Sequence, residues 1–269
     1  MNPAIVPAEP AGATLMRTLF SIGFLARFSY ALARNPVLPL FAVALGAGPE
    51  GIGLAVGIST VTGILFKMPS GALSDVIGRR RTMLAGLVVF GLMPFAYLFI
   101  THYAALAVVR FLHGLATAIY GPVAMAVVAD IAGARKGEML SWFSSVGIAG
   151  TLLGAPIGGY LLFLLGDAQA GLSSYRAVFL CSALTGAAAL GLGFLTLRNG
   201  DKPAEGKNLA ERFHLFAQGI REVVADRRVL MTSSMEGIQN MSMGALEAFL
   251  PVYAVAVAGL NVFQAGLIW

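Results

Sequence analysis

The sequence predicts an all-α polytopic membrane protein, and three observations lead to this fold class. Hydrophobic residues make up 58% of the chain and charged residues only 12%, with a mean hydropathy of +0.81, far from the usage of soluble domains. Apolar runs of about 20 residues, the length a helix needs to cross a hydrocarbon layer, recur along the chain. Dense polar turns separate these runs, as where 71–81 (GALSDVIGRRR) joins 52–73 to 82–100.

The composition also excludes several classes of protein. The net charge is +5, but Lys and Arg gather in short loops beside apolar runs, which argues against a nucleic-acid partner. Cys181 is the only cysteine, so an internal disulfide and a cysteine-based metal site are excluded. The first sixteen residues contain no Lys or Arg, unlike a cleaved secretory signal, and we expect the first apolar segment to remain in the mature protein.

Apolar segments bounded by turn residues predict seven membrane spans. In chain order they are 17–45, 51–73, 82–100, 104–129, 139–165, 175–197 and 229–257. Basic residues alternate between the two sides: one side holds Arg79, Arg80, Arg81, Arg135, Lys136 and seven Lys or Arg between 198 and 228, and the other holds only Arg176. The positive-inside rule therefore predicts a multi-pass protein of the cell membrane with a cytoplasmic amino terminus.

The longest loop, 198–228, starts with the helix-breaking segment 199–203 and then becomes periodic. Apolar residues recur at helical spacing at Leu209, Phe213, Phe216, Ile220 and Val223. This pattern predicts an amphipathic helix on the inner membrane surface. Its role is either coupling or regulation, or that of a linker helix covering two bundles.

An internal repeat predicts the domain organisation. Residues 38–45 (LPLFAVAL) correspond to 250–257 (LPVYAVAV), and each segment precedes a short turn and a new apolar start. The seventh span then repeats the first in the same direction, unless two apolar helix ends are alike by chance. The domains would be a six-helix bundle over 1–197, a cytoplasmic linker over 198–228, and an incomplete second bundle over 229–269. A full second copy would end past roughly residue 400, so we expect a truncated chain in which the eighth span is a stub.

Two polar motifs carry a family resemblance. The turn 71–81 has the spacing Gly-x-Leu-x-Asp-basic-x-Gly-Arg-basic, with Val76 at the first basic position. Its matching residues are Gly71, Leu73, Asp75, Gly78, Arg79 and Arg80. In the fourth span, Arg110-Phe-Leu-His113-Gly114 is similar to Arg-x-x-Gln-Gly, and the exit from Asp130 to Arg135 also fits. Over essentially its whole length the chain resembles the major facilitator superfamily, most closely its twelve-span drug–proton antiporter-like branch.

A third motif, in the fifth span, is similar to the glycine-rich motif of the antiporters. It consists of Gly150, Gly154, Pro156, Gly158 and Gly159, with the proline one position late and Ser141 in place of a leading glycine. Three of the glycines lie four residues apart, which permits close helix contact on one face, and Pro156 is expected to bend the span. Ordinary tight packing is the alternative to a role in antiport.

The resemblance implies that Asp75 and Arg79 help to hold the two bundles together on the cytoplasmic side and gate inward opening. Elementary chemistry offers a simpler alternative for this motif. Asp75 lies near a span end, where backbone groups lack partners, and the three arginines that follow face anionic headgroups. Part of the motif would then only orient the protein in the membrane.

Four cations fall inside predicted spans: Arg27, Arg34, Lys67 and Arg110. Each costs about 2.5–3.5 kcal/mol on an insertion scale unless it is paired or hydrated. Lys67 and Arg110 lie near span ends, so snorkelling to the interface is an alternative to function. Arg27 and Arg34 are seven residues apart and should share one helix face, lining a central cavity beside Asn35.

The first six spans contain no carboxylate, so the cations need anionic partners from elsewhere. The repeat places Glu247 at the position of Asn35, and Glu236 lies in the same span; a second bundle or an anionic substrate are the other sources. We expect Glu247 to carry a proton, with packing alone as the alternative.

The resemblance implies a proton-coupled secondary transporter of small organic solutes that works by alternating access between two bundles. Arg27, Arg34, Asn35, Arg110 and Glu247 would line the route, and the second bundle would be needed for activity. Cavity arginines favour an anionic or polar solute, whereas the glycine motif favours hydrophobic drug efflux.

Three other classes of protein compete with the transporter. An enzyme is disfavoured because no catalytic or metal-binding constellation occurs. A seven-span receptor is disfavoured by the inward amino terminus and the repeat. A non-transporting membrane fragment or scaffold stays open as the alternative.

Overall fold

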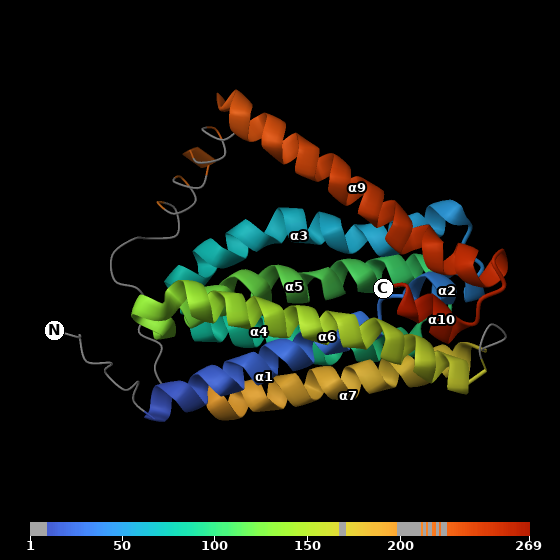
Figure 1. Ribbon diagram of the computed structural model, residues 1–269, viewed down its shortest axis with the longest axis horizontal. Coiled ribbons are helices and arrows are strands. Elements are labelled where there is room, and N and C mark those ends of the chain that lie inside the picture. The colour runs from blue at the N-terminus through green and yellow to red at the C-terminus, as the bar shows by residue number, and fades with distance from the viewer. Residues whose placement is uncertain are drawn as a thin grey trace.

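The computed structural model describes residues 10–166, 171–197 and 225–269, together with positions 211, 214, 217, 218 and 221. These residues form a bundle of long helices (Figure 1). In order, the elements are α1 (Pro10–Leu32), α2 (Val37–Ala44), α3 (Pro49–Ile77), α4 (Arg79–Ala96) with the short helix η1 (Tyr97–Phe99), α5 (Tyr103–Ala132), η2 (Gly133–Arg135), α6 (Lys136–Leu164), α7 (Leu172–Thr196), α9 (Arg227–Ala256) and α10 (Val262–Leu267). Five apolar residues were predicted to form the apolar face of an amphipathic helix. These residues, Leu209, Phe213, Phe216, Ile220 and Val223, lie outside the described part.

Each of the seven predicted spans contains a described helix, but the first span is not one continuous helix. It divides into α1 and α2 at residues 33–36, because Pro36 has no backbone donor and disfavours helical geometry at Asn35. Four described stretches are long and apolar enough to cross a membrane: Pro49–Asp75, Arg79–Phe99, Tyr103–Leu164, which joins α5 to α6, and Leu172–Thr196.

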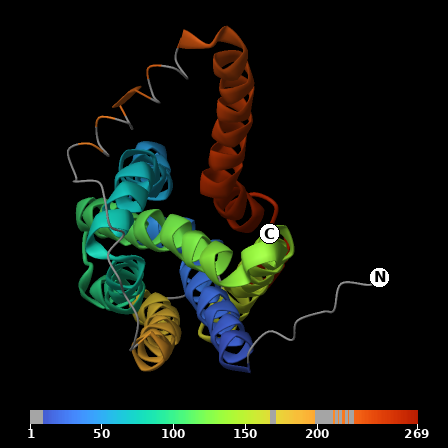
Figure 2. The same cartoon turned by 90° about the vertical axis from the view of Figure 1, so that its left-hand side faces the viewer.

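The first six spans pack as a bundle in which α1 contacts α6 on one side and α7 on another, while α5 packs against α3 and α4 (Figures 1 and 2). Ser29 of α1 and Ser182 of α7 each donate a hydroxyl hydrogen bond to the other's carbonyl oxygen, at 2.8 and 2.7 Å. These reciprocal bonds satisfy two buried polar groups inside the bundle.

Three of the α6 glycines lie close to the backbone of α1. An ideal Cβ atom would lie 2.7 Å from the carbonyl oxygen of Phe24 at Gly150, 2.9 Å from that of Phe28 at Gly154, and 2.5 Å from that of Leu32 at Gly158. Any larger residue would collide with backbone, so these glycines set the distance between the two helices. The helix continues through Pro156.

Gly159 faces a different neighbour, α10. An ideal Cβ atom at Gly159 would lie 2.8 Å from the carbonyl oxygen of Val262, and one at Gly266 would lie 3.1 Å from that of Ala155. Asn261 and Gln264 form a reciprocal capping box that starts α10. The glycine motif therefore serves two interfaces, one with α1 and one with α10.

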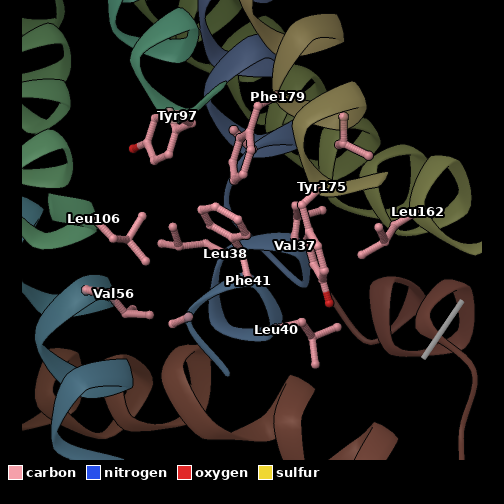
Figure 3. Close-up of a cluster of buried hydrophobic side chains, with 14 of the residues drawn as sticks. Val37, Leu38, Leu40, Phe41, Val56, Tyr97, Leu106, Leu162, Tyr175 and Phe179 are labelled. Carbon is pink, nitrogen blue, oxygen red and sulfur yellow. The ribbon is translucent and has the colours of Figure 1, made fainter. Parts of the chain in front are cut away.

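Helix α2 lies in the larger apolar core at one end of the bundle (Figure 3). The Phe41 ring is 5.0 Å from that of Phe179 and 5.4 Å from that of Tyr175, and Phe179 stacks on Tyr97 at 4.5 Å. Val37, Leu38 and Phe41 are fully buried there. This packing holds the broken first span in place after residue 36.

Helix α9 runs in the same direction as α1 and contacts the bundle only near its own carboxyl-terminal half (Figure 1). Its buried residues are Ala248, Pro251 and Ala254, whereas residues 227–243 are all exposed. The end-on view shows this helix standing apart from the other spans (Figure 2). Gly46 after α2 and Gly259 after α9 both have positive φ, +79° and +68°, so the two repeat segments end in similar turns.

Candidate functional site

A cavity with a volume of about 670 Å³ lies between α1, α3 and α5. Both Arg27 and Arg34 line it, as their spacing predicted, and so does Lys67. The rest of the lining is Tyr30, Ser59, Thr60, Gly63, Ile64, Met68, Thr117, Gly121, Pro122 and Met125. No carboxylate belongs to this lining in the part of the chain that the structure describes.

A second cavity, of about 330 Å³, lies between α1, α5 and α6. It shares Arg27, Gly121 and Met125 with the larger cavity, so the two meet at Arg27. Its other lining residues are Gly23, Tyr120, Phe143, Ser144, Gly147, Ile148, Thr151 and Leu152.

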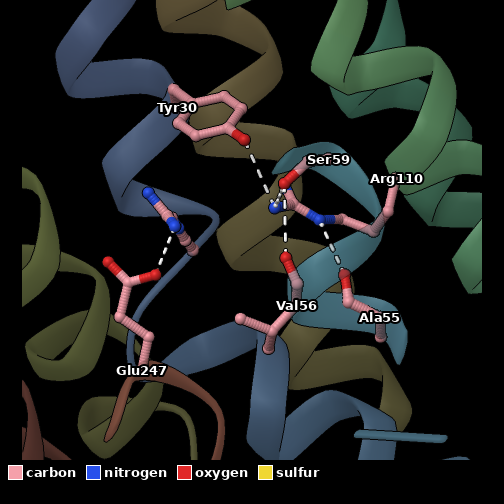
Figure 4. A network of polar contacts seen from close by, with 7 residues as sticks. Tyr30, Ala55, Val56, Ser59, Arg110 and Glu247 are labelled. Carbon is pink, nitrogen blue, oxygen red and sulfur yellow. Dashed lines mark hydrogen bonds and ion pairs between the residues drawn. The ribbon is translucent and has the colours of Figure 1, made fainter. Parts of the chain in front are cut away.

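Arg34 forms an ion pair with Glu247, which joins the break in the first span to α9 (Figure 4). The two side chains are 28% and 24% exposed, so water screens the pair only in part. The expected anionic partner in the seventh span is therefore present for Arg34. Glu236 lies on the exposed half of α9, away from this pair.

Arg110 is fully buried and is held by three uncharged acceptors (Figure 4). Its Nε donates to the carbonyl oxygen of Ala55 at 3.2 Å, and its Nη2 donates to Ser59 Oγ at 2.9 Å and to the Tyr30 hydroxyl at 3.3 Å. Snorkelling does not describe this arginine, because its head points into the bundle rather than to an interface. Arg110 lines neither cavity.

The ring of Tyr30 lies close to the guanidinium groups of both Arg110 and Arg34. The Tyr30 ring centroid is 5.3 Å from Arg110 Cζ and 5.8 Å from Arg34 Cζ, both within cation–π range. The ring also packs edge-on against His113, at 4.9 Å. The hydroxyl of Tyr97 lies 3.1 Å from His113 Nδ1 and so partners that buried ring. A chain of polar and aromatic contacts therefore runs from Glu247 to His113.

Sequence reasoning missed Ser59 and Tyr97 in this network. Ser59 lies among other small polar residues of α3, and only its close approach to α5 distinguishes it. That approach depends on Gly114, where an ideal Cβ atom would lie 3.0 Å from Ser59 Cα. Asn35, which was predicted to line the route, is buried and lines neither cavity; its Oδ1 atom accepts no hydrogen bond from a described residue.

The predicted gating motif lies at the opposite end of the bundle from α2, and its charges are paired. Arg79 is 3.5 Å from Asp75 and also forms an ion pair with Asp130 of α5. Gly78 joins α3 to α4 with φ of +110°, a backbone conformation that favours glycine. Gly71, Leu73 and Arg80 are partly buried around this turn. We call this end of the bundle the charged end.

The site as a whole offers cations and hydroxyls in a large cavity, and Glu247 pairs with Arg34 without belonging to the lining of that cavity. Among the described residues, no group of three or more His, Cys, Asp or Glu side chains could hold a metal ion. Such a site can bind a polar or charged solute, and none of the described residues that form it places a nucleophile beside a base.

Two curated proteins are similar to this chain over part of its length. The chain is 30% identical over 154 residues to the uncharacterized MFS-type transporter MJ1560 of Methanocaldococcus jannaschii, covering 57% of this chain and 38% of that protein. It is 25% identical over 127 residues to the quinolone resistance protein NorA of Staphylococcus aureus, covering 47% and 33% respectively. The chain thus spans less than two-fifths of the length of these relatives.

Solved structures with the same fold are also transporters. A bacterial homologue of the human lysosomal transporter Spinster, in an inward-facing and unoccupied conformation, aligns with a TM-score of 0.69 at 16% identity, over 97% of this chain and 59% of that one. At that identity the likeness shows the fold alone.

The family model of the Major Facilitator Superfamily matches residues 19–269. The resemblance carried by the polar motifs is therefore confirmed, and so are the all-α polytopic membrane fold and the exclusion of an enzyme. The chain belongs to the Major Facilitator Superfamily, a family of membrane transporters.

Proposed function

We propose that this chain forms the first bundle and the start of the second in a proton-coupled transporter of small organic solutes. The observation that carries the proposal is the Arg34–Glu247 ion pair, which ties the first span to the seventh beside a 670 Å³ cavity. Cavities of this size suit small-molecule ligands. In this proposal Arg27, Arg34 and Glu247 contact solute or proton, and Arg110 positions Tyr30.

Glu247 would act as the coupling group. When its carboxylate is ionised, the attraction of Arg34 holds α9 against the broken end of the first span. Protonation removes one charge of the pair and with it most of that attraction, so the two helices can separate. A solute with its own negative charge would compete for Arg34 in the same way.

The charged end would form the second gate. The half of α9 nearest that end is exposed along 227–243, and no residue of α9 lines the cavity. In this proposal the charged end is cytoplasmic, the amino terminus lies on the same side, and Asp75 and Arg79 bind the second bundle when the cavity closes. In alternating access, the Arg34–Glu247 pair would form in one state of the transporter. The contacts between the charged end and the second bundle would form in the other state.

Transport into proteoliposomes under an imposed pH gradient tests the proposal. The 269 residues are compared with a chain that continues into a second bundle, using a quinolone, the class in a relative's name, and a panel of organic anions and cations. We expect Glu247→Gln to abolish gradient-driven accumulation but to keep exchange of solute for solute, because exchange needs no proton release. Glu236→Gln, on the exposed half of the same helix, is the matched control.

The outcome separates the proposal from its alternative. Gradient-driven accumulation that survives in Glu247→Gln would exclude this residue as the coupling group. Absence of transport and of exchange in every form, across the whole panel, would favour the non-transporting scaffold.

A further inference from the structure

Arg27 differs from the other arginines of the site because no described residue pairs with it. Arg34 pairs with Glu247 and Arg110 has three acceptors, but Arg27 forms no hydrogen bond or ion pair with any residue of the described ranges. It lies near the middle of the first span, where an unpaired cation is costly. Its guanidinium is exposed where the two cavities meet.

Two glycines keep space open along this side chain. An ideal Cβ atom at Gly147 of α6 would lie 3.6 Å from Arg27 Cγ, and one at Gly121 of α5 would lie 4.0 Å from Arg27 Nη2. Larger side chains at these positions would fill the space beside the guanidinium. The group is therefore accessible from the 330 Å³ cavity.

A second polar group of that cavity also has no hydrogen-bond partner among the described residues. Tyr120 is 2% exposed, and its hydroxyl makes no hydrogen bond with a described residue. A buried hydroxyl without a partner is destabilising unless water or a ligand satisfies it. Arg27 and Tyr120 line the same cavity, so one acceptor group could serve both.

The rest of the wall is mainly apolar. Met125, Phe143, Ile148 and Leu152 face the cavity, with Ser144 and Thr151 as the hydroxyl groups. No carboxylate lines either cavity among the described residues, and Lys67 adds a further positive charge in the larger one. The site thus combines a positive group without a counter-ion and an apolar wall large enough for an aromatic or aliphatic body.

We propose that the cavity between α1, α5 and α6 binds an amphipathic organic anion, with its acidic group on Arg27 and its apolar body against Phe143, Ile148 and Leu152. This inference rests on the proposed function, because it names the class of solute that the transporter carries. A guanidinium fits carboxylate, sulfonate and phosphate groups by charge-assisted hydrogen bonds, so a soluble organic anion and an anionic lipid share the required chemistry.

Direct binding tests this inference without requiring transport. The 269-residue chain is placed in phosphatidylcholine nanodiscs and titrated with radiolabelled 2-naphthalenesulfonate, whose charge does not change with pH, and with the neutral 2-naphthalenesulfonamide. We expect the sulfonate to bind at least ~10-fold more tightly than the sulfonamide, since a charge-assisted bond to Arg27 is lost in the neutral analogue. Adding phosphatidylglycerol to the discs distinguishes the two sources: displacement of the sulfonate assigns the site to a lipid headgroup, and no displacement assigns it to a soluble anion.

Variants locate the binding. Arg27→Gln should remove the preference for the sulfonate, and Arg27→Lys should keep part of it. Thr151→Phe, which fills the cavity without changing its charge, should weaken both ligands. Lys136→Gln removes a cation that lines neither cavity and should leave both affinities unchanged.

Two results would overturn the inference: equal binding of the two ligands, or sulfonate binding that survives in a folded Arg27→Gln chain. Either result leaves transport of neutral or cationic solutes intact as a function. Conversely, Arg27-dependent sulfonate binding by a protein that transports nothing would support the anion site and count against the proposed function.

Discussion

Arg110 and Arg27 are both cations inside membrane spans, yet one lies on the packed side of the bundle and the other on the cavity side. Arg110 is fully buried, with Ala55, Ser59 and Tyr30 as acceptors. Arg27 is exposed between two cavities and is bonded to no described residue. Charge within a span therefore has two separate explanations in this molecule: Arg110 ties helices together, and Arg27 is available to a ligand.

Glycines also have different roles beside the two kinds of arginine. On the packed side, Gly154 and Gly158 bring the backbones of α1 and α6 together. On the cavity side, Gly121 and Gly147 leave room beside Arg27. Along α6, Gly154 and Gly158 thus allow backbone contact with α1, whereas Gly147, two turns earlier, leaves room beside Arg27, and substitutions should separate the two roles.

The largest expected effect is on the packed side, at Arg110. Arg110→Leu leaves Ser59 and the Ala55 carbonyl without their buried donor, so the free energy of unfolding should fall by ~3 kcal/mol. Arg27→Leu is the matched control and should change it by less than about 0.5 kcal/mol, because no described partner is lost. Thermal unfolding in detergent, followed by size exclusion, measures both. Equal losses in the two variants would contradict the distinction between the two sides.

A smaller loss is expected at the α1–α6 contact. In Gly158→Ala the new methyl would lie 2.5 Å from the Leu32 carbonyl oxygen, so backbone must move, at a cost of about 2 kcal/mol. Gly191→Ala, on an exposed face of α7 with no atom within 4 Å of the new methyl, should be neutral or stabilising. The same unfolding assay applies, and an unchanged Gly158→Ala chain would show that this contact is looser than described.

The sequence predicted the fold better than the partners of its charges. Hydrophobic runs and polar turns predicted seven segments that each contain a described helix, because crossing a membrane imposes length and composition on each span separately. Helical spacing also placed Arg27 and Arg34 on one cavity, and the glycine spacing predicted close packing. These features depend on neighbours along the chain.

The surroundings of Arg110 could not be predicted in the same way. Whether an arginine snorkels or is buried depends on which helix lies opposite, and Ala55 and Ser59 are distant in sequence. The break in the first span was missed although Pro36 was visible, because the apolar pattern continues through it. The division of the glycine motif between α1 and α10 likewise depends on tertiary packing.

The Arg34–Glu247 pair should contribute moderately to the free energy of unfolding, by less than the loss expected for Gly158→Ala. A double-mutant cycle with Arg34→Gln and Glu247→Gln should give a coupling energy of ~1 kcal/mol, because the pair is mostly but not fully shielded from water. The cycle is measured by thermal unfolding at low and high salt. A coupling energy of zero would mean that the pair does not hold α9 to the first span, and the proposed role of Glu247 would lose its physical basis.

The smallest effect is expected at the charged end, where the exposed pair of Arg135 and Glu138 provides the reference for an ion pair in water. Hydrogen bonds from Arg135, with Nε 2.9 Å from a Glu138 oxygen, lower the pKa of Glu138 below its ordinary value of 4.5. Because the folded-state pKa is lowered, this carboxylate stabilises the fold above pH 4.5 and loses that contribution as the pH falls through the folded-state value.

Titration of ¹³C-labelled glutamate by NMR measures this directly. Arg135→Gln should return the pKa of Glu138 toward 4.5, whereas Lys136→Gln, beside it in sequence, should leave it low. The melting temperature should change by less than about 1 °C, since exposed pairs contribute little. A larger change here than at Arg34–Glu247 would reverse the ranking of the two pairs, and the shielding of the pair beside the cavity would then not account for its strength.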